Sequence, residues 1–272
     1  MNQQPTLVTD RVQRASKPTP PVPVAAGARR SVVSLSVYTG TYAAFIDAVM
    51  QAAHRHEPRS ACFANVHMVV EARRDPAIAA AVNGADWVCP DGVPLTWAMR
   101  LLYGLRQERV AGMDVTDTLL ARAAAESVSV YFFGSTPEVL ARIRAQCADR
   151  FPGLVIAGMV SPPFRPATPA EDAAAAAAIR ASGAGLVFVG LGCPKQERWM
   201  ARLRGQVPAV LLGVGGALPV LAGDQARAAA WIRRAGLEWL FRLLLEPRRL
   251  LKRYAVTNPL YVYYLLKQWL RR

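Results

Sequence analysis

Short apolar runs alternate with helix-forming segments along most of this 272-residue chain. The runs are rich in valine, leucine and phenylalanine and are predicted to be strands; they cover residues 31–37, 60–66, 85–89, 127–133, 154–160, 186–189 and 209–212. Strands that alternate with helices predict right-handed β-α-β crossovers and a mostly parallel sheet. The sequence therefore predicts an α/β, Rossmann-like fold with helices on both faces of the sheet.

Composition changes at both ends of the chain and divides it into three parts. Residues 1–30 are rich in proline and hold five Lys or Arg residues against one Asp, which predicts a disordered basic tail. Residues 31–224 are predicted to form the α/β body. Residues 225–272 hold eleven Lys or Arg residues against two Glu, interleaved with tryptophan, tyrosine and leucine, and are predicted to form a helical appendage. The net charge of +14 thus belongs almost entirely to the two ends.

The basic, aromatic-rich appendage is typical of a helix that lies in a membrane interface, where Lys and Arg meet anionic headgroups. Two core helices with basic outer faces are an open alternative. Nucleic-acid binding fits less well, because the body is nearly neutral and the appendage is strongly aliphatic. The chain has no uninterrupted apolar run long enough to span a bilayer, and its beginning lacks the pattern of a signal peptide.

Polar residues follow four of the predicted strands at the point where each strand ends. They are Asn65; Asp91; Gly134 with Ser135; and Lys195, Gln196 and Glu197 after the turn at Gly190 and Gly192. The carboxyl ends of parallel strands meet at one edge of the sheet, where open α/β sheets bind their ligands. We therefore expect a binding site at this edge, although solvated helix starts would produce the same pattern.

Asp91 is the best candidate for a catalytic group. It stands between Pro90 and Gly92 directly after an apolar strand, so its backbone is constrained and its carboxylate can face a cleft. A carboxylate in such a place can take a proton from a substrate hydroxyl. The alternative is that Asp91 only caps the helix that is expected to begin at Val93.

Motifs of several other enzyme classes are absent. The chain has no Asp-x-Asp pair for a magnesium-bound diphosphate, no P-loop, and no Gly-x-Gly-x-x-Gly after its first strand. The last absence disfavours a nicotinamide-dependent epimerase or dehydrogenase. The four cysteines, Cys62, Cys89, Cys147 and Cys193, have neither zinc-site nor disulfide spacing and are expected to be small buried residues. We expect no metal and no cofactor.

An anionic leaving group formed without a metal needs other positive partners. The run at 213–216 places Gly215 and Gly216 where bare backbone N–H groups can approach a phosphate. Arginine is the side chain best suited to hold such a group, and arginines are abundant only in the appendage.

Six stretches, in order, resemble the WecG/TagA/CpsF family of bacterial glycosyltransferases over roughly residues 31–255. They are residues 85–92, 109–114, 131–135, 190–197, 213–217, and 236–243 with 246–249. The resemblance implies an inverting, metal-independent transfer from a UDP-sugar to a sugar on a polyprenyl diphosphate at the inner face of the cell membrane. It also implies that Asp91 is the base, that Asn65 and Gln196 are polar pocket residues, and that the appendage binds the membrane and brings arginines over the site. Its arginines are expected to be Arg227, Arg234 and Arg242.

Two departures from the family pattern bear on the donor sugar and on the appendage. Phe63 stands where the family often has threonine, and Ala229 stands where it usually has proline. Residues 65–68 are more similar to the xanthan-type exopolysaccharide branch, which favours glucose as the transferred sugar. The alternatives are N-acetylmannosamine or its uronic acid in wall or surface polymers and, in another class, a non-catalytic membrane-surface adaptor. A homo-oligomer stays open.

Overall fold

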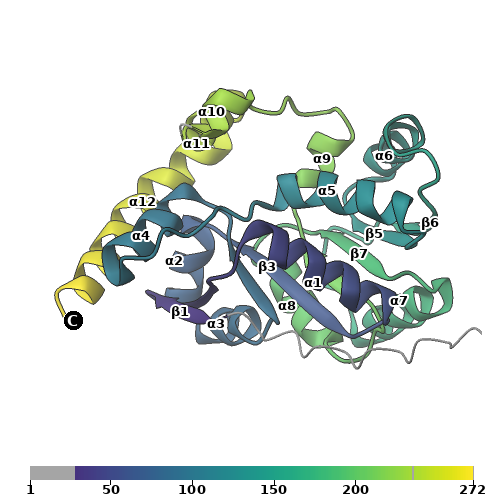
Figure 1. The fold of residues 1–272 in the computed structure, drawn as a ribbon, viewed down its shortest axis with the longest axis horizontal. Coiled ribbons are helices and arrows are strands. Elements are labelled where there is room, and N and C mark those ends of the chain that lie inside the picture. Colours follow the sequence, from purple (N-terminus) through teal and green to yellow (C-terminus); the bar gives the residue numbers. More distant parts are fainter. Residues whose placement is uncertain (1–27, 235, 272) are drawn as a thin grey trace, which may run out of the picture.

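A computed structural model describes residues 28–234 and 236–271 and contains one central sheet of six parallel strands (Figure 1). In order across the sheet, the strands are β4 (Trp87–Pro90), β3 (Arg59–Ala64), β8 (Val210–Gly213), β7 (Leu186–Gly190), β5 (Val130–Gly134) and β6 (Ile156–Val160). The predicted parallel α/β architecture is confirmed.

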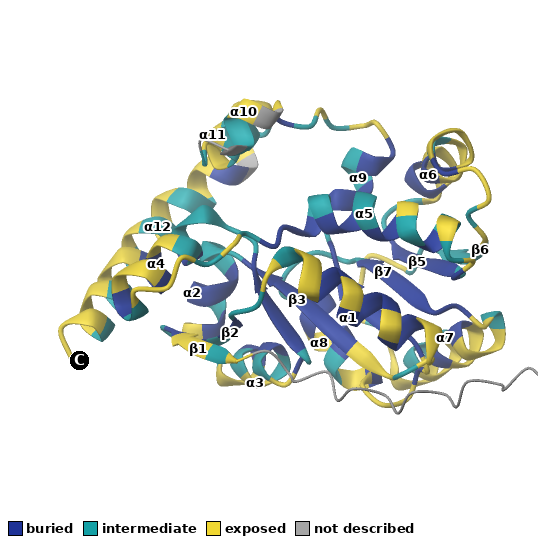
Figure 2. Cartoon of the chain, in the orientation of Figure 1, coloured by how far each residue is buried: buried dark blue, intermediate teal, exposed yellow. Residues whose placement is uncertain are grey.

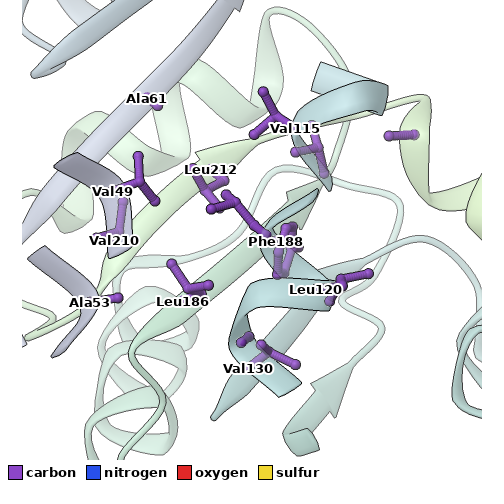
Figure 3. Packing of buried hydrophobic residues seen from close by; sticks show 14 of the residues in the cluster. Val49, Ala53, Ala61, Val115, Leu120, Val130, Leu186, Phe188, Val210 and Leu212 are labelled. Carbon is purple, nitrogen blue, oxygen red and sulfur yellow. The ribbon is translucent and has the colours of Figure 1, made fainter. Parts of the chain in front are cut away.

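Helices cover both faces of this sheet because its strands are apolar on both sides. The helices of the body are α1 (Tyr42–His54), α2 (Val66–Arg74), α3 (Pro76–Asn83), α4 (Val93–Tyr103), α5 (Gly112–Ala125), α6 (Pro137–Arg150), α7 (Pro169–Ser182), α8 (Lys195–Leu203) and α9 (Ala217–Leu221). Leu186 and Phe188 of β7 pack with α1, α5, α6 and α9 on one face, in the cluster that Figure 3 shows. Val187 and Val189 pack with α2, α3, α4, α7 and α8 on the other face.

The prediction of a single strand at residues 31–37 is wrong. Residues 31–37 do not make one strand but belong to an antiparallel hairpin, β1 (Arg29–Val32) and β2 (Leu35–Tyr38), that forms a separate sheet beside β4. The chain reverses at Val33, whose φ of +57° lies in the left-handed region. Arg29 and Arg30, assigned by sequence to the disordered tail, are part of β1, while residues 1–27 lie outside the described residues.

Sequence-local capping explains where several helices begin. Thr136 caps α6 and Pro137 is its first residue, as the sequence predicts, with the Thr136 hydroxyl accepting from Val139 N–H (3.4 Å). Asn65 caps α2 by accepting from Met68 N–H (3.1 Å). Asp114 lies inside the first turn of α5, and Ala111 occupies the cap position without a side-chain hydrogen bond.

The C-terminal segment forms α10 (Ala230–Arg234), α11 (Glu238–Leu245) and the long α12 (Pro247–Trp269). Helix α12 lies alongside α2 and α4 (Figure 1). Tyr261 is buried and donates its hydroxyl to the Pro94 carbonyl (2.9 Å), and Gln268 bonds to Val33 N–H (2.7 Å) and to the Ser31 carbonyl (2.9 Å). The opposite side of α12 is exposed (Figure 2). Within the described ranges, no helix combines the length and apolar character that crossing a bilayer requires.

Candidate functional site

A cavity of about 550 Å³ lies where the carboxyl ends of β3 and β4 meet the C-terminal helices. Its walls come from α2, α4, α11 and α12. Its lining includes the charged side chains of Asp91, Arg109, Glu238, Arg242 and Arg253, together with Asn65 and His67. The cavity therefore joins the expected edge of the sheet to the basic appendage.

Asp91 and Asn65 are brought together by strand pairing. Ala64 of β3 pairs with Pro90 of β4. Asn65 and Asp91 directly follow these two residues, so they lie side by side at neighbouring strand ends. The Asp91 N–H also donates to the Ala64 carbonyl (2.9 Å). Helix α4 starts from Gly92 without a side-chain cap, so Asp91 is not the cap that the alternative interpretation required. Its carboxylate lines the cavity and accepts no hydrogen bond from any residue that the structure describes.

The Asp91 carboxyl group is tuned to exchange a proton near neutral pH. Its pKa is raised from 3.8 to about 7, mainly by desolvation in the cleft and next by the nearby Glu238 carboxylate. The guanidinium groups of Arg109 and Arg242 act in the opposite direction, and Asp114 adds a smaller upward contribution. A pKa close to the working pH is what a general base needs, since it can then be both ionised and basic.

Arg242 connects the cavity to the glycine-rich loop after β8. It lines the cavity and acts electrostatically on Asp91. A Cβ placed on Gly216 would lie 2.9 Å from Nη2 of Arg242, so the guanidinium group rests against this loop. The backbone at Gly216 can approach so closely because glycine has no side chain. One of the three predicted appendage arginines thus stands beside both Asp91 and the loop.

The other two predicted arginines are placed differently. Arg227 forms ion pairs with Asp114 and Asp117 and lines a separate cavity of about 160 Å³. The side chain of Arg234 lies outside what the structure describes. Arg227 therefore binds the start of the appendage to α5 and does not reach the main cavity.

Arg109 and Glu238 are site residues that reasoning from the sequence did not single out. Arg109 donates to Glu238 of α11 (2.8 Å) and to Asp114 of α5 (2.8 Å), and both Arg109 and Glu238 line the cavity. Each belongs to a stretch that carries the family resemblance, which was the available signal. Their partnership was not visible because 129 positions separate them.

Gln196 lies beneath the loops rather than in the cavity. Its Nε2 donates to the Gly213 carbonyl (2.8 Å) and to Oε1 of Glu197 (2.8 Å), and its Oε1 accepts from Gly192 N–H (3.2 Å). These bonds tie the loop after β7 to the end of β8. Burial raises the pKa of Glu197, and Lys195 is exposed at the first position of α8. Lys195, Gln196 and Glu197 are absent from the cavity lining.

The glycines at the other strand ends serve close backbone packing. Gly134 has φ +117°, and a Cβ there would lie 2.6 Å from the carbonyl of Gly190. A Cβ on Gly190 would in turn lie 2.3 Å from Leu218. Ser135, which also has a positive φ, donates its N–H to the Gly190 carbonyl (3.2 Å). Gly192 and Gly215 adopt positive φ in the neighbouring loops, and none of these residues lines the main cavity.

No group of three or more His, Cys, Asp or Glu side chains placed to hold a metal ion is found among residues 28–234 and 236–271. All four cysteines are free thiols. Three are buried as expected, whereas Cys193 is only partly buried, because it lies in the loop between β7 and α8.

Comparisons with known proteins agree on one family. The profile described as "Glycosyl transferase WecG/TagA/CpsF family" matches residues 30–272. A relative from Bacillus spizizenii, named N-acetylglucosaminyldiphosphoundecaprenol N-acetyl-beta-D-mannosaminyltransferase, is 34% identical over 205 residues, which is 75% of this chain and 77% of the relative.

Proposed function

Because this chain belongs to the WecG/TagA/CpsF family and is a glycosyltransferase, we propose that it transfers N-acetylmannosamine from a UDP-sugar to N-acetylglucosamine on a polyprenyl diphosphate. The name of the Bacillus relative supports the transferred sugar and the lipid-linked acceptor. The hypothesis from residues 65–68 that glucose is the transferred sugar has no such support, so N-acetylmannosamine replaces glucose in the proposal.

The observation that carries the proposal is the position of Asp91 in a cavity that it shares with Arg242, with its pKa raised to about 7. In the proposed step, the Asp91 carboxylate removes the proton from an acceptor hydroxyl. The hydroxyl oxygen then forms a bond to the anomeric carbon, from the side opposite to UDP. The bond between that carbon and UDP breaks, and UDP leaves with the electron pair, so the configuration is inverted.

Positive groups close to Asp91 would stabilise the departing UDP. Arg242 lies against the loop that contains Gly215 and Gly216, so a diphosphate there would meet both a guanidinium group and backbone N–H groups. Asn65 accepts from the Met68 N–H through its Oδ1, and it lines the cavity together with Asp91. We assign it to positioning the acceptor sugar.

The exposed apolar side chains of the C-terminal helices support a membrane surface as a further partner. Large ones, exposed by 45% or more, include Trp239, Leu244, Leu251, Val262 and Leu270. They share these helices with most of the basic residues of the appendage, the combination that favours binding to an anionic bilayer. We propose that the enzyme works as a peripheral protein at the inner face of the cell membrane.

A turnover assay with the full chain tests the proposal. Purified protein is offered UDP-N-acetylmannosamine, UDP-glucose or UDP-N-acetylglucosamine together with N-acetylglucosamine on a short prenyl diphosphate. We expect UDP release with the first donor only. Asp91→Asn should keep the wild-type circular dichroism spectrum and lose about 10²–10⁴-fold in turnover, the usual value of general-base assistance. Near-normal turnover by that variant would show that Asp91 is not the general base. Preferential use of UDP-glucose would show that glucose is the transferred sugar.

A further inference from the structure

The cavity changes character along its length, and α12 shows this most clearly. The residues of α12 that line the cavity follow one another at alternating steps of three and one, so they lie on one face of the helix. In order they are Leu250, Arg253, Tyr254, Thr257, Asn258, Tyr261, Val262 and Leu265. Beyond Leu250 they pass from charged, through polar, to apolar. The stretch from Arg253 to Leu265 rises roughly 18 Å at 1.5 Å per residue.

The facing wall, from α4, is apolar throughout. It consists of Val93, Pro94, Trp97, Ala98 and Leu101. Trp97 is 65% exposed and Leu101 is 46% exposed, while Val262 on the opposite wall is 52% exposed. Large apolar side chains on both walls of an open groove leave apolar area in water that an apolar ligand would cover.

The end of the same groove that Arg253 and His67 line suits a diphosphate. Helix α2 begins there, with Val66 and His67. The first N–H groups of a helix have no intrahelical partners, so the N-terminus of a helix attracts anions. Burial lowers the pKa of the His67 imidazole on α2, and Arg253 of α12 lies close enough to lower it further. The Nδ1 atom of His67 is buried without a hydrogen-bond partner among the described residues.

We propose that the groove between α4 and α12 holds the first isoprene units of the acceptor lipid, with its diphosphate beside Arg253 and the α2 N-terminus. This assignment rests on the proposed function and specifies its acceptor site. The acceptor sugar then extends from the diphosphate toward Asp91, and the rest of the prenyl chain leaves past Trp97 and Val262. Charge at one end and apolar walls at the other match a prenyl diphosphate better than a nucleotide, which has no apolar tail.

Two valines of α12 provide a matched test on the full chain. Val262 lines the groove and is 52% exposed, whereas Val256 is 42% exposed on the same helix and does not line it. Binding of farnesyl diphosphate, measured by isothermal titration calorimetry without vesicles, should weaken about tenfold in Val262→Asn and stay at the wild-type value in Val256→Asn. Arg253→Gln should weaken the binding of both farnesyl diphosphate and inorganic diphosphate.

The proposal is overturned if the two valine variants bind farnesyl diphosphate equally well. It is also overturned if a short-chain phosphatidylcholine binds as tightly as farnesyl diphosphate and is equally sensitive to Val262→Asn, because the groove would then be a general lipid surface. These calorimetric results stand even if no sugar is transferred. A wild-type chain that bound farnesyl diphosphate as expected but turned over none of the UDP-sugars would contradict the proposed function alone.

Discussion

At the scale of single residues, the catalytic role proposed for Asp91 comes with a cost in stability. Its pKa is raised from 3.8 to about 7, so the folded protein keeps the proton over a pH range in which the unfolded chain has lost it. The contribution of this group to stability is therefore complete below about pH 4, falls as the pH rises toward 7, and stays at its minimum above that. The ionised form of Asp91, which the proposed reaction needs, is therefore the form that is unfavourable for folding.

Asp91→Asn should consequently be more stable than the wild type at pH 8, because asparagine has the same shape and does not ionise. At pH 4 the two proteins should unfold at the same temperature, since Asp91 is then protonated. Thermal unfolding followed by circular dichroism at both pH values checks this. A lower melting temperature for the variant at pH 8 would mean that the carboxylate has a stabilising partner in the folded protein.

Gly134 shows a different single-residue constraint, the contact between two loop backbones. An added Cβ would lie 2.6 Å from the carbonyl group of Gly190 at a φ of +117°. Gly134→Ala should lower the free energy of unfolding by about 3 kcal/mol or more, from overpacking together with backbone strain. Gly104→Ala is the matched control, because Gly104 also has positive φ (+68°) but no atom within 4 Å of its Cβ position. It should cost only about 1 kcal/mol in urea unfolding, and equal losses would refute the contact argument.

At the scale of elements, the appendage is held to the body by charge as well as by packing. Asp114 of α5 accepts hydrogen bonds from Arg109, from Arg227 in the segment before α10, and from Arg233 within α10. Arg109 extends the network to Glu238 of α11. These ion pairs set the position of α11, and with it the position of Arg242 over the cavity.

Asp114→Asn should loosen α10 and α11 without unfolding the sheet, because three arginines lose their common anion. We expect the local opening free energy of residues 225–245 to fall by about 1–3 kcal/mol, measured as faster amide hydrogen exchange, with strands β5 and β7 unchanged. Asp47→Asn is the control, since Asp47 pairs with Arg122 while its side chain is 59% exposed. Protection of the appendage at the wild-type level would show that packing alone holds it.

At the scale of the whole molecule, the C-terminal helices add little to the two apolar clusters of the body. Apart from Tyr261, every buried residue of the two apolar clusters precedes Asp224. Helix α12 nevertheless forms one wall of the main cavity and covers α2. The body should therefore fold without these helices and lack a complete site.

A chain that ends after Asp224 should show a cooperative thermal transition at a lower temperature than the full chain. It should neither sediment with anionic vesicles nor act on lipid-linked acceptors in liposomes, whereas the full chain should bind at low salt and dissociate at high salt. Full activity of the shortened chain on liposomes would contradict the role given to the appendage.

Much of this arrangement follows from local patterns in the sequence. The parallel sheet could be predicted from apolar runs, from helix caps such as Thr136, and from the order of strands and helices. Each of these signals depends only on residues that are close together in the sequence. Asp91 and Asn65 could be placed together for the same reason, since both follow strands whose carboxyl ends share one edge. The hairpin at residues 29–38 escaped this reasoning because Val33 carries none of the usual turn signals.

The sequence by itself determined the fold class and the concentration of charge at the chain ends, and it indicated the edge of the sheet where we propose that catalysis takes place. Only the tertiary structure decided which arginine reaches Asp91. Arg227 and Arg242 both belong to the basic appendage, but Asp114 and Asp117 neutralise the first, whereas the second lies over the glycine loop. The physical reason is that electrostatic partnership depends on distances between elements far apart in the chain, and those distances exist only once α11 and α12 have packed against the body.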